Sequence, residues 1–584
     1  MRLRKYLSTI FGDPRKRLFV FLGILFLSTV CLYASVFNNP FVWDDFYVIV
    51  KNKHVHELQN FLTFFSENTY QGSGSIGVNW RPLMLTTFSS LWHFFGGWTV
   101  PYHAASIFLH ALNAFLVYVL LNRLFRKHWA AFLAALVFAI HPLQTQAVVY
   151  IAGLGDPLGG GFVLLGAISY AKWRDGNERT KAYLLGSILC FMCALLSKEN
   201  AVMMPGLIFL IDIFLKKGGD PFWKKMWVTV QDLTPFIYLF LAYIIARLTF
   251  LNFLPNVYTS SFSVPLYERI LVFLSTVTDY FRLIFAPLHL HMEHTVYMVN
   301  SLFEPKAFIG FLIMSVLLTA IVTQWKKRPA VSFGFLWFLV AYSPNMNIFM
   351  PTTNLFGEHW LYLSLPGLFL AIFSVGEEIA QKNRRFLTIL LLVLIIWAGW
   401  ISGVTVVRNL DWETPIGILE QTHREEPKHV QVMIVLASLY RDNGEYDKAL
   451  EHYANALALE SYNYLAYSER AELYKKIGDE ARMISDMENS CQFDSVHSPS
   501  LEPLLEIYTQ KRELDKAESL LFSRLNALGD KDPVLSFWVT TQLVLVAVGK
   551  QDHKLIQEYL TLGGTYEKQI NEQWFYKADR YMAR

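Results

Sequence analysis

The sequence predicts an all-α membrane protein, with a polytopic helical domain of about eleven spans followed by a domain of helical repeats. Three observations predict it: an apolar composition, short basic clusters between apolar runs up to about Val406, and a 34-residue period after residue 430. Of the 584 residues, 53% are hydrophobic and only 17% are charged, whereas soluble domains carry about 25% charged residues. We therefore expect a membrane domain over residues 1–410 and a soluble domain over residues 411–584.

Twelve apolar segments precede the soluble domain, and most are near the length needed to cross about 30 Å of hydrocarbon. They are residues 18–36, 103–121, 129–150, 158–171, 182–197, 200–215, 227–248, 267–287, 305–324, 330–343, 360–379 and 386–406. The first follows Arg15, Lys16 and Arg17 and has no clear small-residue cleavage site. It therefore predicts a retained membrane anchor rather than a removed signal peptide.

Five basic clusters orient these segments, because short loops rich in Lys and Arg stay cytoplasmic. The clusters are Arg123–His128, Lys172–Lys181, Lys216–Lys225, Lys326–Arg328 and Lys382–Arg385. All five basic clusters lie on the cytoplasmic side only if one segment between residues 249 and 304 does not cross the membrane. Segment 267–287 contains Glu268, Arg269, Asp279 and Arg282, which are costly in mid-bilayer. We take it as re-entrant or interfacial, which gives eleven spans and places the C-terminal domain on the non-cytoplasmic side.

Internal repeats define the C-terminal domain. Tyr440, Tyr474 and Tyr508 are 34 residues apart, and Gly444 recurs as Gly478. A period of about 34 residues with aromatic and small positions of this kind is typical of tetratricopeptide repeats, each a helix pair that buries its apolar face on its neighbours. Chance periodicity in an unrelated helical bundle is the alternative.

Composition excludes several functions. A net charge of +3 is too small to indicate nucleic-acid binding. The four cysteines are Cys31, Cys190 and Cys193 in apolar runs and Cys491 in the soluble domain. That distribution supports neither a disulfide framework nor a thiolate zinc site.

The predicted topology gathers the unusual polar residues on the outer side, whereas the cytoplasmic loops carry mainly Lys and Arg. The outer groups are Asp44 and Asp45, Asn79–Pro82, Tyr102 and His103, Gly155 and Asp156, Ser197–Asn200, His289–His294 and Gly357–His359. Chemistry on a lipid-linked substrate requires a polar site with carboxylates at the membrane surface, and the predicted topology provides one.

Five ordered motifs carry a resemblance to a known family. They are Phe41–Asn52, Asn79–Leu83 followed by Tyr102, His103 and His110, Phe138–Val148 with Asp156, Ser197–Glu199, and Glu358–Pro366. With the repeats, they resemble the transmembrane and tetratricopeptide-repeat O-mannosyltransferases over almost the whole chain. The resemblance implies a GT-C fold and a polyprenyl-phosphate-linked sugar as donor.

Three positions depart from the family pattern. Gln146 stands where the family commonly has Glu, Leu154-Gly155-Asp156 where it has Arg-Ala-Asp, and His359 where Arg often follows the Glu. These departures favour an alternative, a catalytically inactive membrane-anchored scaffold. Retention of both aspartates, Arg81 and Lys198 favours the enzyme. A lipid-sugar transporter, a flippase or polymerase, is a third hypothesis, and it gives no reason for two aspartates in the first outer loop.

The implied reaction moves a sugar, with mannose as the favoured candidate, from a polyprenyl phosphate to the hydroxyl group of a protein Ser or Thr. The configuration of the anomeric carbon is inverted. A hydroxyl group is a poor nucleophile, so a carboxylate must accept its proton. The family pattern assigns this site to Asp44 and Asp45, and we expect Asp44 to be the base and Asp45 to position it. An Asx turn or helix cap in an outer loop is the alternative reading.

The departing lipid phosphate needs cations or hydrogen-bond donors. The candidates for binding the donor phosphate and sugar are Arg81, His103, Lys198, Glu199, Asp156 and Glu358. Each has an ordinary alternative: Lys198 can reach lipid headgroups, Arg81 can pair with a carboxylate such as Asp45, and Glu358 can be a charge at a helix N-terminus.

No cofactor is firmly implied. A divalent metal has one weak candidate set, His291, Glu293 and His294, whose spacing does not suit one helix face. The expected partners are the bilayer, the polyprenyl-phosphate sugar and a protein acceptor held in the groove of the repeats. The chain has no Asn-x-Ser/Thr site, which favours a bacterial inner membrane over the endoplasmic reticulum.

Overall fold

The computed structural model describes residues 13–75, 77–175, 181–215, 222–251, 264–348, 355–528 and 532–582. Within these ranges every regular element is a helix, which confirms the predicted all-α class. Parts of two predicted basic clusters, residues 176–180 and 216–221, lie outside the described residues.

The chain forms two compact units, residues 1–425 and 426–584. The sequence placed the division after residue 410. The helix α17 (Pro415–Glu425) instead groups with the first unit.

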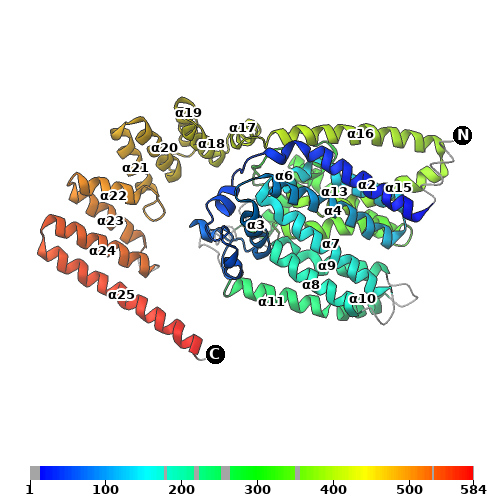
Figure 1. Cartoon of the computed structure of the whole chain (residues 1–584), viewed down its shortest axis with the longest axis horizontal. Helices are drawn as coiled ribbons and strands as arrows, with labels where there is room; N and C mark the ends of the chain where they lie inside the picture. Colours follow the sequence, from blue (N-terminus) through cyan, green and yellow to red (C-terminus); the bar gives the residue numbers. More distant parts are fainter. Residues whose placement is uncertain are drawn as a thin grey trace. The chain divides into compact units, whose positions relative to one another are not determined.

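Long helices dominate the first unit (Figure 1). They are α2 (Pro14–Tyr33), α3 (Pro82–Phe95), α4 (Val100–Phe125), α5 (His128–Ile140), α6 (Thr145–Val149), α7 (Gly155–Arg174), α8 (Lys181–Ser197), α9 (Met204–Leu215), α10 (Phe222–Asp232), α11 (Thr234–Leu248), α12 (Leu266–Phe285), α13 (Pro305–Gln324), α14 (Pro329–Tyr342), α15 (Leu365–Lys382), α16 (Arg384–Leu410) and α17. Short helical turns connect several of them: η1 (Ala34–Asn38), η2 (Phe46–Val50), η3 (Leu58–Phe65), η4 (Gln71–Ser73), η5 (Pro142–Gln144), η6 (Ile151–Leu154), η8 (Glu199–Met203), η10 (Ser343–Asn345) and η11 (Glu358–Leu361).

Six helices in the described ranges are long and apolar enough to cross a membrane, and the number rises to eight if each of two bent helix pairs forms one span. By length and composition, these helices support the predicted membrane domain. The segment expected not to cross forms α12, which is not among the six. One of the six, Pro533–Lys550, lies in the second unit. The count of eleven spans remains a prediction.

The core of the first unit is built around α7, which packs against α4, α8 and α9. On another side α15 packs against α5 and α14. The backbones of α14 and α15 touch where Gly334 faces Gly367: a Cβ atom on Gly334 would lie 2.4 Å from the carbonyl oxygen of Gly367. No larger residue fits there without separating the two helices.

The segment between α2 and α3 has a small hydrophobic core of its own. Val48, Ile49, Val55 and Phe64 pack against residues of α3, α4 and η6. This packing holds the loop that carries Asp44 and Asp45 against the ends of three helices.

The second unit consists of helices that pair with their sequence neighbours (Figure 1). They are α18 (Val430–Asp442), α19 (Tyr446–Leu459), α20 (Tyr464–Ile477), α21 (Glu480–Phe493), α22 (Leu501–Gln510), α23 (Leu514–Leu528), α24 (Pro533–Lys550) and α25 (His553–Met582). Tyr440, Tyr474 and Tyr508 are buried near the ends of α18, α20 and α22. The period thus coincides with a repeating helix pair, and the tetratricopeptide superhelix remains a prediction.

Candidate active site

Asp44 and Asp45 are adjacent in sequence but differ in what they contact. The carboxylate of Asp45 is fully buried and accepts two backbone N–H groups, from Val42 at 2.9 Å and from Ala152 at 2.7 Å. The second bond ties the loop to η6, directly before α7. Both carboxylate oxygens of Asp45 therefore bind backbone N–H groups, and its role in positioning Asp44 remains a prediction.

Asp44 is held by two tyrosines. Tyr70 donates its hydroxyl group to Oδ2 of Asp44 at 3.1 Å, and the Asp44 N–H donates to Oη of Tyr150 at 3.1 Å. Burial raises the pKa of Asp44, while the hydrogen bonds from the tyrosines and the charge of Arg81 act in the opposite direction. Asp44 has an intermediate exposure, whereas Asp45 is fully buried, so Asp44 is the more accessible member of the pair.

Arg81 lies at the N-terminal end of α3 and pairs with Glu199 on η8. Its Nε donates to Oε2 of Glu199 at 2.9 Å, and its Nη2 donates to Oε1. Burial opposes ionisation of Glu199, but Arg81 outweighs it and lowers the pKa of Glu199 to about 2. The partner of Arg81 is therefore Glu199, not Asp45.

Lys198 forms the second ion pair of the site. Its Nζ lies 2.6 Å from Oδ2 of Asp156, and both side chains are less than a tenth exposed. Asp156 lies in the first turn of α7, where a negative charge is favoured. Arg81 and Glu199 lie close enough to influence the charge of Lys198, so the two ion pairs form one group of four charges.

A pocket opens beside this group. Its lining includes Asp156 and Lys198, the glycines Gly155, Gly159 and Gly160 of α7, and His359, Trp360 and Tyr362 from the segment around η11. A Cβ atom on Gly160 would lie 3.0 Å from the ring of Tyr362. The glycine face of α7 therefore lets Lys198 and Tyr362 approach the helix closely.

His359 and Gln146, two of the positions that depart from the family pattern, contact each other. Nδ1 of His359 lies 2.9 Å from Oε1 of Gln146. Burial lowers the pKa of His359 well below its ordinary value, and the positive charges of Lys198 and Arg81 lower it further. The surroundings of His359 thus disfavour its protonated form, at a position where the family pattern often has an arginine.

Two of the expected donor-binding residues have other partners. His103 is buried on α4, where its Nε2 lies 3.1 Å from the carbonyl oxygen of Asn39. Glu358 is fully buried and accepts from the backbone N–H of His291 at 2.7 Å. Its other oxygen lies 3.5 Å from Nη2 of Arg408 on α16. The structure gives neither residue a contact with Arg81 or Lys198.

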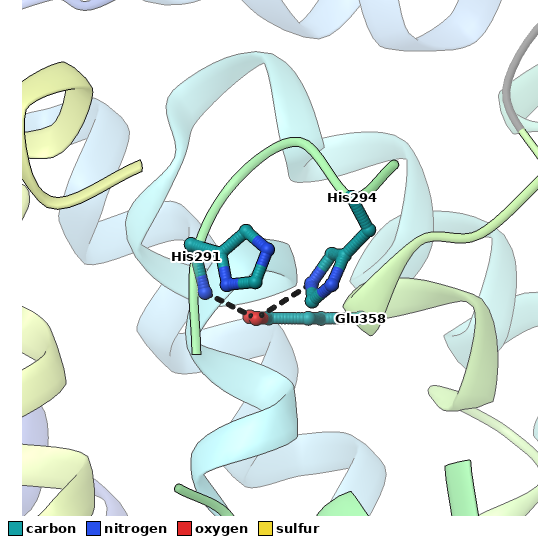
Figure 2. A group of neighbouring side chains, drawn as sticks. All are labelled: His291, His294 and Glu358. Atoms are coloured by element: carbon teal, nitrogen blue, oxygen red, sulfur yellow. Dashed lines mark hydrogen bonds and ion pairs between the residues drawn. The ribbon is translucent and has the colours of Figure 1, made fainter. Parts of the chain in front are cut away.

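The expected metal candidates lie in the irregular segment between α12 and α13. His291 and His294 group with Glu358, and the ligand atoms of the three all lie within 4.8 Å of one another (Figure 2). Glu293, the third member expected from the sequence, is not part of that group. Burial and the nearby charge of Asp44 raise the pKa of Glu293 to about 7.

Sequence reasoning missed Tyr70, Tyr150 and Arg408. Tyr150 stands two residues after the Phe138–Val148 motif, so its proximity to a recognised motif was a usable signal. Tyr70 stands in a segment with no recognised motif, and no pattern in the sequence pairs it with Asp44, 26 residues away. Arg408 stands two residues after the last apolar segment, residues 386–406. That position could have indicated a cation buried at the end of a membrane helix.

The fold and site together describe an integral membrane protein with a carboxylate, two carboxylate-paired cations and a pocket at the ends of its helices. No family model matches the chain. Over 75% of its length, the chain is 24% identical to a protein O-mannosyl-transferase of Caenorhabditis elegans and covers 62% of that protein. It is 21% identical to the human protein O-mannosyl-transferase TMTC3, over 77% of this chain and 52% of that protein.

The resemblance predicted from the motifs is therefore confirmed: the curated relatives are protein O-mannosyl-transferases. The chain spans between about half and three fifths of the length of these two relatives. Among solved structures, the archaeal oligosaccharyltransferase AglB from Archaeoglobus fulgidus matches with a TM-score of 0.38 and 12% identity, over 72% of this chain and 60% of that one.

Proposed function

We propose that this protein is a membrane glycosyltransferase that moves mannose from a polyprenyl phosphate to a Ser or Thr hydroxyl group of a protein, with inversion. The observation that carries the proposal is the environment of Asp44. Its carboxylate accepts a hydrogen bond from Tyr70 and is influenced by the charge of Arg81, and its backbone N–H donates to Tyr150. The similarity to protein O-mannosyl-transferases supports the choice of sugar and acceptor.

In the proposed reaction the acceptor hydroxyl oxygen forms the new bond to the anomeric carbon of the sugar. The bond from that carbon to the phosphate oxygen breaks, and the polyprenyl phosphate leaves as an anion. Asp44 accepts the hydroxyl proton as the new bond forms. Burial raises the pKa of Asp44, which makes it a stronger base than an exposed aspartate. Attack from the side opposite the phosphate inverts the anomeric centre.

The two cations are proposed to stabilise the phosphate. Arg81 binds Glu199 through Nε and Nη2, so Nη1 is the donor that this pair does not use. Lys198 lines the pocket while paired with Asp156. Each carboxylate fixes its cation in place, and preorganised charges stabilise the leaving anion without reorganisation during the reaction.

The second unit is proposed to hold the acceptor on the non-cytoplasmic side. A hollow between α20, α21 and α22 is lined by Met483, Met487 and Ile507 together with the charged Lys475 and Glu506. Methionine-rich surfaces adapt to varied peptides. Reporter domains fused after residue 410 and after residue 584 test on which side of the membrane the second unit lies. We expect activity only from a reporter that works outside the cytoplasm. Activity of a cytoplasmic reporter would contradict the proposed location.

The test of the activity uses the purified full chain with labelled polyprenyl-phosphate mannose and a Ser/Thr-rich acceptor protein. We expect Asp44→Asn, which keeps the shape and removes the base, to lower transfer by about 10²-fold or more with little change in donor binding. Arg81→Ala should weaken donor binding as well as turnover. Transfer at the parental rate by Asp44→Asn would refute the catalytic role and favour the inactive scaffold.

A further inference from the structure

We propose that His291, His294 and Glu358 form a binding site for one divalent cation of the zinc class. The site is separate from the four charges around Lys198, and the inference does not depend on the proposed transferase activity. It is carried by three ligand groups that converge from two segments far apart in the sequence and by the hydrogen bonds that orient them.

The geometry is close to that of a metal site. In a tetrahedral zinc shell with bonds of about 2.0–2.2 Å, neighbouring ligand atoms lie about 3.3–3.6 Å apart. Nε2 of His294 lies 3.2 Å from Oε1 of Glu358, and the ligand atoms of all three residues lie within 4.8 Å of one another. Figure 2 shows both imidazole rings on the same side of the Glu358 carboxylate. Small side-chain rotations therefore bring the three atoms onto one ion.

The surrounding contacts are those of a ligand shell. Nδ1 of His291 lies 2.8 Å from the carbonyl oxygen of His289, which selects the tautomer with Nε2 as the metal ligand. Arg408 lies 3.5 Å from Oε2 of Glu358, and the backbone N–H of His291 donates to Oε1, which holds Oε1 on the side of the histidines. Metal-binding histidines and carboxylates are oriented by such outer partners.

The types of ligand atom determine which metal ions suit the site. Two imidazole nitrogens and one carboxylate oxygen are a ligand set of zinc sites, and imidazole also suits other first-row transition metals. Calcium and magnesium prefer oxygen ligands. When the ion binds, it takes the Nε2 lone pair of His294, and the ring proton is carried on Nδ1 instead.

The ion would join the irregular segment between α12 and α13 to the start of η11. His291 and His294 lie between α12 and α13, and Glu358 begins η11, whose His359 and Trp360 line the pocket. A bound cation would fix the segment that carries Glu293 to the wall of the pocket. We therefore assign the ion a positioning role.

The experiment uses the full chain in detergent, purified without a polyhistidine tag and loaded with Zn²⁺ or, for spectroscopy, with Co²⁺. We expect one metal ion per chain by elemental analysis and the visible absorption of cobalt in a low-coordinate nitrogen and oxygen site. His294→Gln should weaken Zn²⁺ binding by about 100-fold or more, since loss of an outer partner alone costs about 10–100-fold.

The matched control is His497→Gln. His497 also pairs with a carboxylate, that of Asp494, but it is mostly exposed and lies in the second unit. This variant should bind Zn²⁺ like the parent chain. If His294→Gln does not fold, the cobalt spectrum and metal content of the parent chain decide. A parent chain without stoichiometric metal, or equal binding by His294→Gln, would overturn the proposal.

Discussion

Tyr70 donates its hydroxyl group to Asp44 across 26 residues of sequence, and Tyr150 accepts from the backbone N–H of the same aspartate. Both tyrosines favour the ionised carboxylate of Asp44, and Tyr150 also holds its backbone. Substitution of either tyrosine therefore tests the environment of this carboxylate.

Removing the Tyr70 hydroxyl group should shift the pH dependence of transfer. The hydrogen bond favours ionised Asp44, so its loss in Tyr70→Phe raises the pKa of Asp44 further above the ordinary value. The base acts in its ionised form, and transfer rises as the pH rises through this pKa. We expect the acidic limb of the rate–pH profile to move to higher pH in Tyr70→Phe.

Tyr467→Phe, in the second unit, is a control that should leave the profile in place. A Tyr70→Phe profile that superimposes on the parental one would mean that Asp44 is not the titrating base.

Asp45→Asn should lower stability more than Asp44→Asn does. An asparagine side chain can accept one of the two N–H groups that Asp45 binds, but its NH₂ group then faces the other. A buried donor left without an acceptor costs about 1–3 kcal/mol. Thermal unfolding of both variants in the same detergent measures the difference, and equal melting temperatures would contradict the structural role of Asp45.

The Lys198–Asp156 pair should show strong coupling in a double-mutant cycle. Removal of one partner of a buried ion pair leaves an uncompensated charge and costs about 3–5 kcal/mol. We expect Lys198→Met and Asp156→Leu each to lower the free energy of unfolding, and the double variant to lose clearly less than the sum. The exposed pair Lys475–Glu472 serves as the control, where the coupling should be close to zero. Additive losses at Lys198 and Asp156 would show that the pair does not act as a unit.

Deletion of residues 430–584 should separate donor binding from transfer to protein. The base and the expected phosphate ligands all lie in the first unit, so the shortened chain should bind the polyprenyl-phosphate sugar like the parent. Transfer to a protein acceptor should fall, whereas transfer to a short peptide at high concentration should fall less. Loss of donor binding in a folded shortened chain would place part of the donor site in the second unit.

Sequence patterns predicted the helical class because apolar runs and the 34-residue period are local properties of the chain. They also placed Asp44, Arg81, Asp156 and Lys198 among the candidates through recognisable motifs. Which of these residues contact one another depends on how helices pack, and that information is not local. Arg81 and Glu199 are 118 residues apart, so the sequence offered several carboxylates as partners for Arg81.

The metal candidates show the same limit. His291, Glu293 and His294 stand together in the sequence and were grouped for that reason. In the structure the irregular backbone brings both histidines to Glu358. The direction of side chains in a segment without regular secondary structure does not follow from spacing, so the identity of the third ligand required the fold.

The unequal use of the two adjacent aspartates has a consequence for reading related chains. A relative that keeps an aspartate at position 45 and replaces the one at position 44 would retain the link to η6 and lose the proposed proton acceptor. Under the proposed mechanism, such a chain would fold but would not transfer the sugar. The opposite replacement would give an unstable enzyme that could be rescued by low temperature. The two kinds of loss can thus be told apart by inspecting one dipeptide.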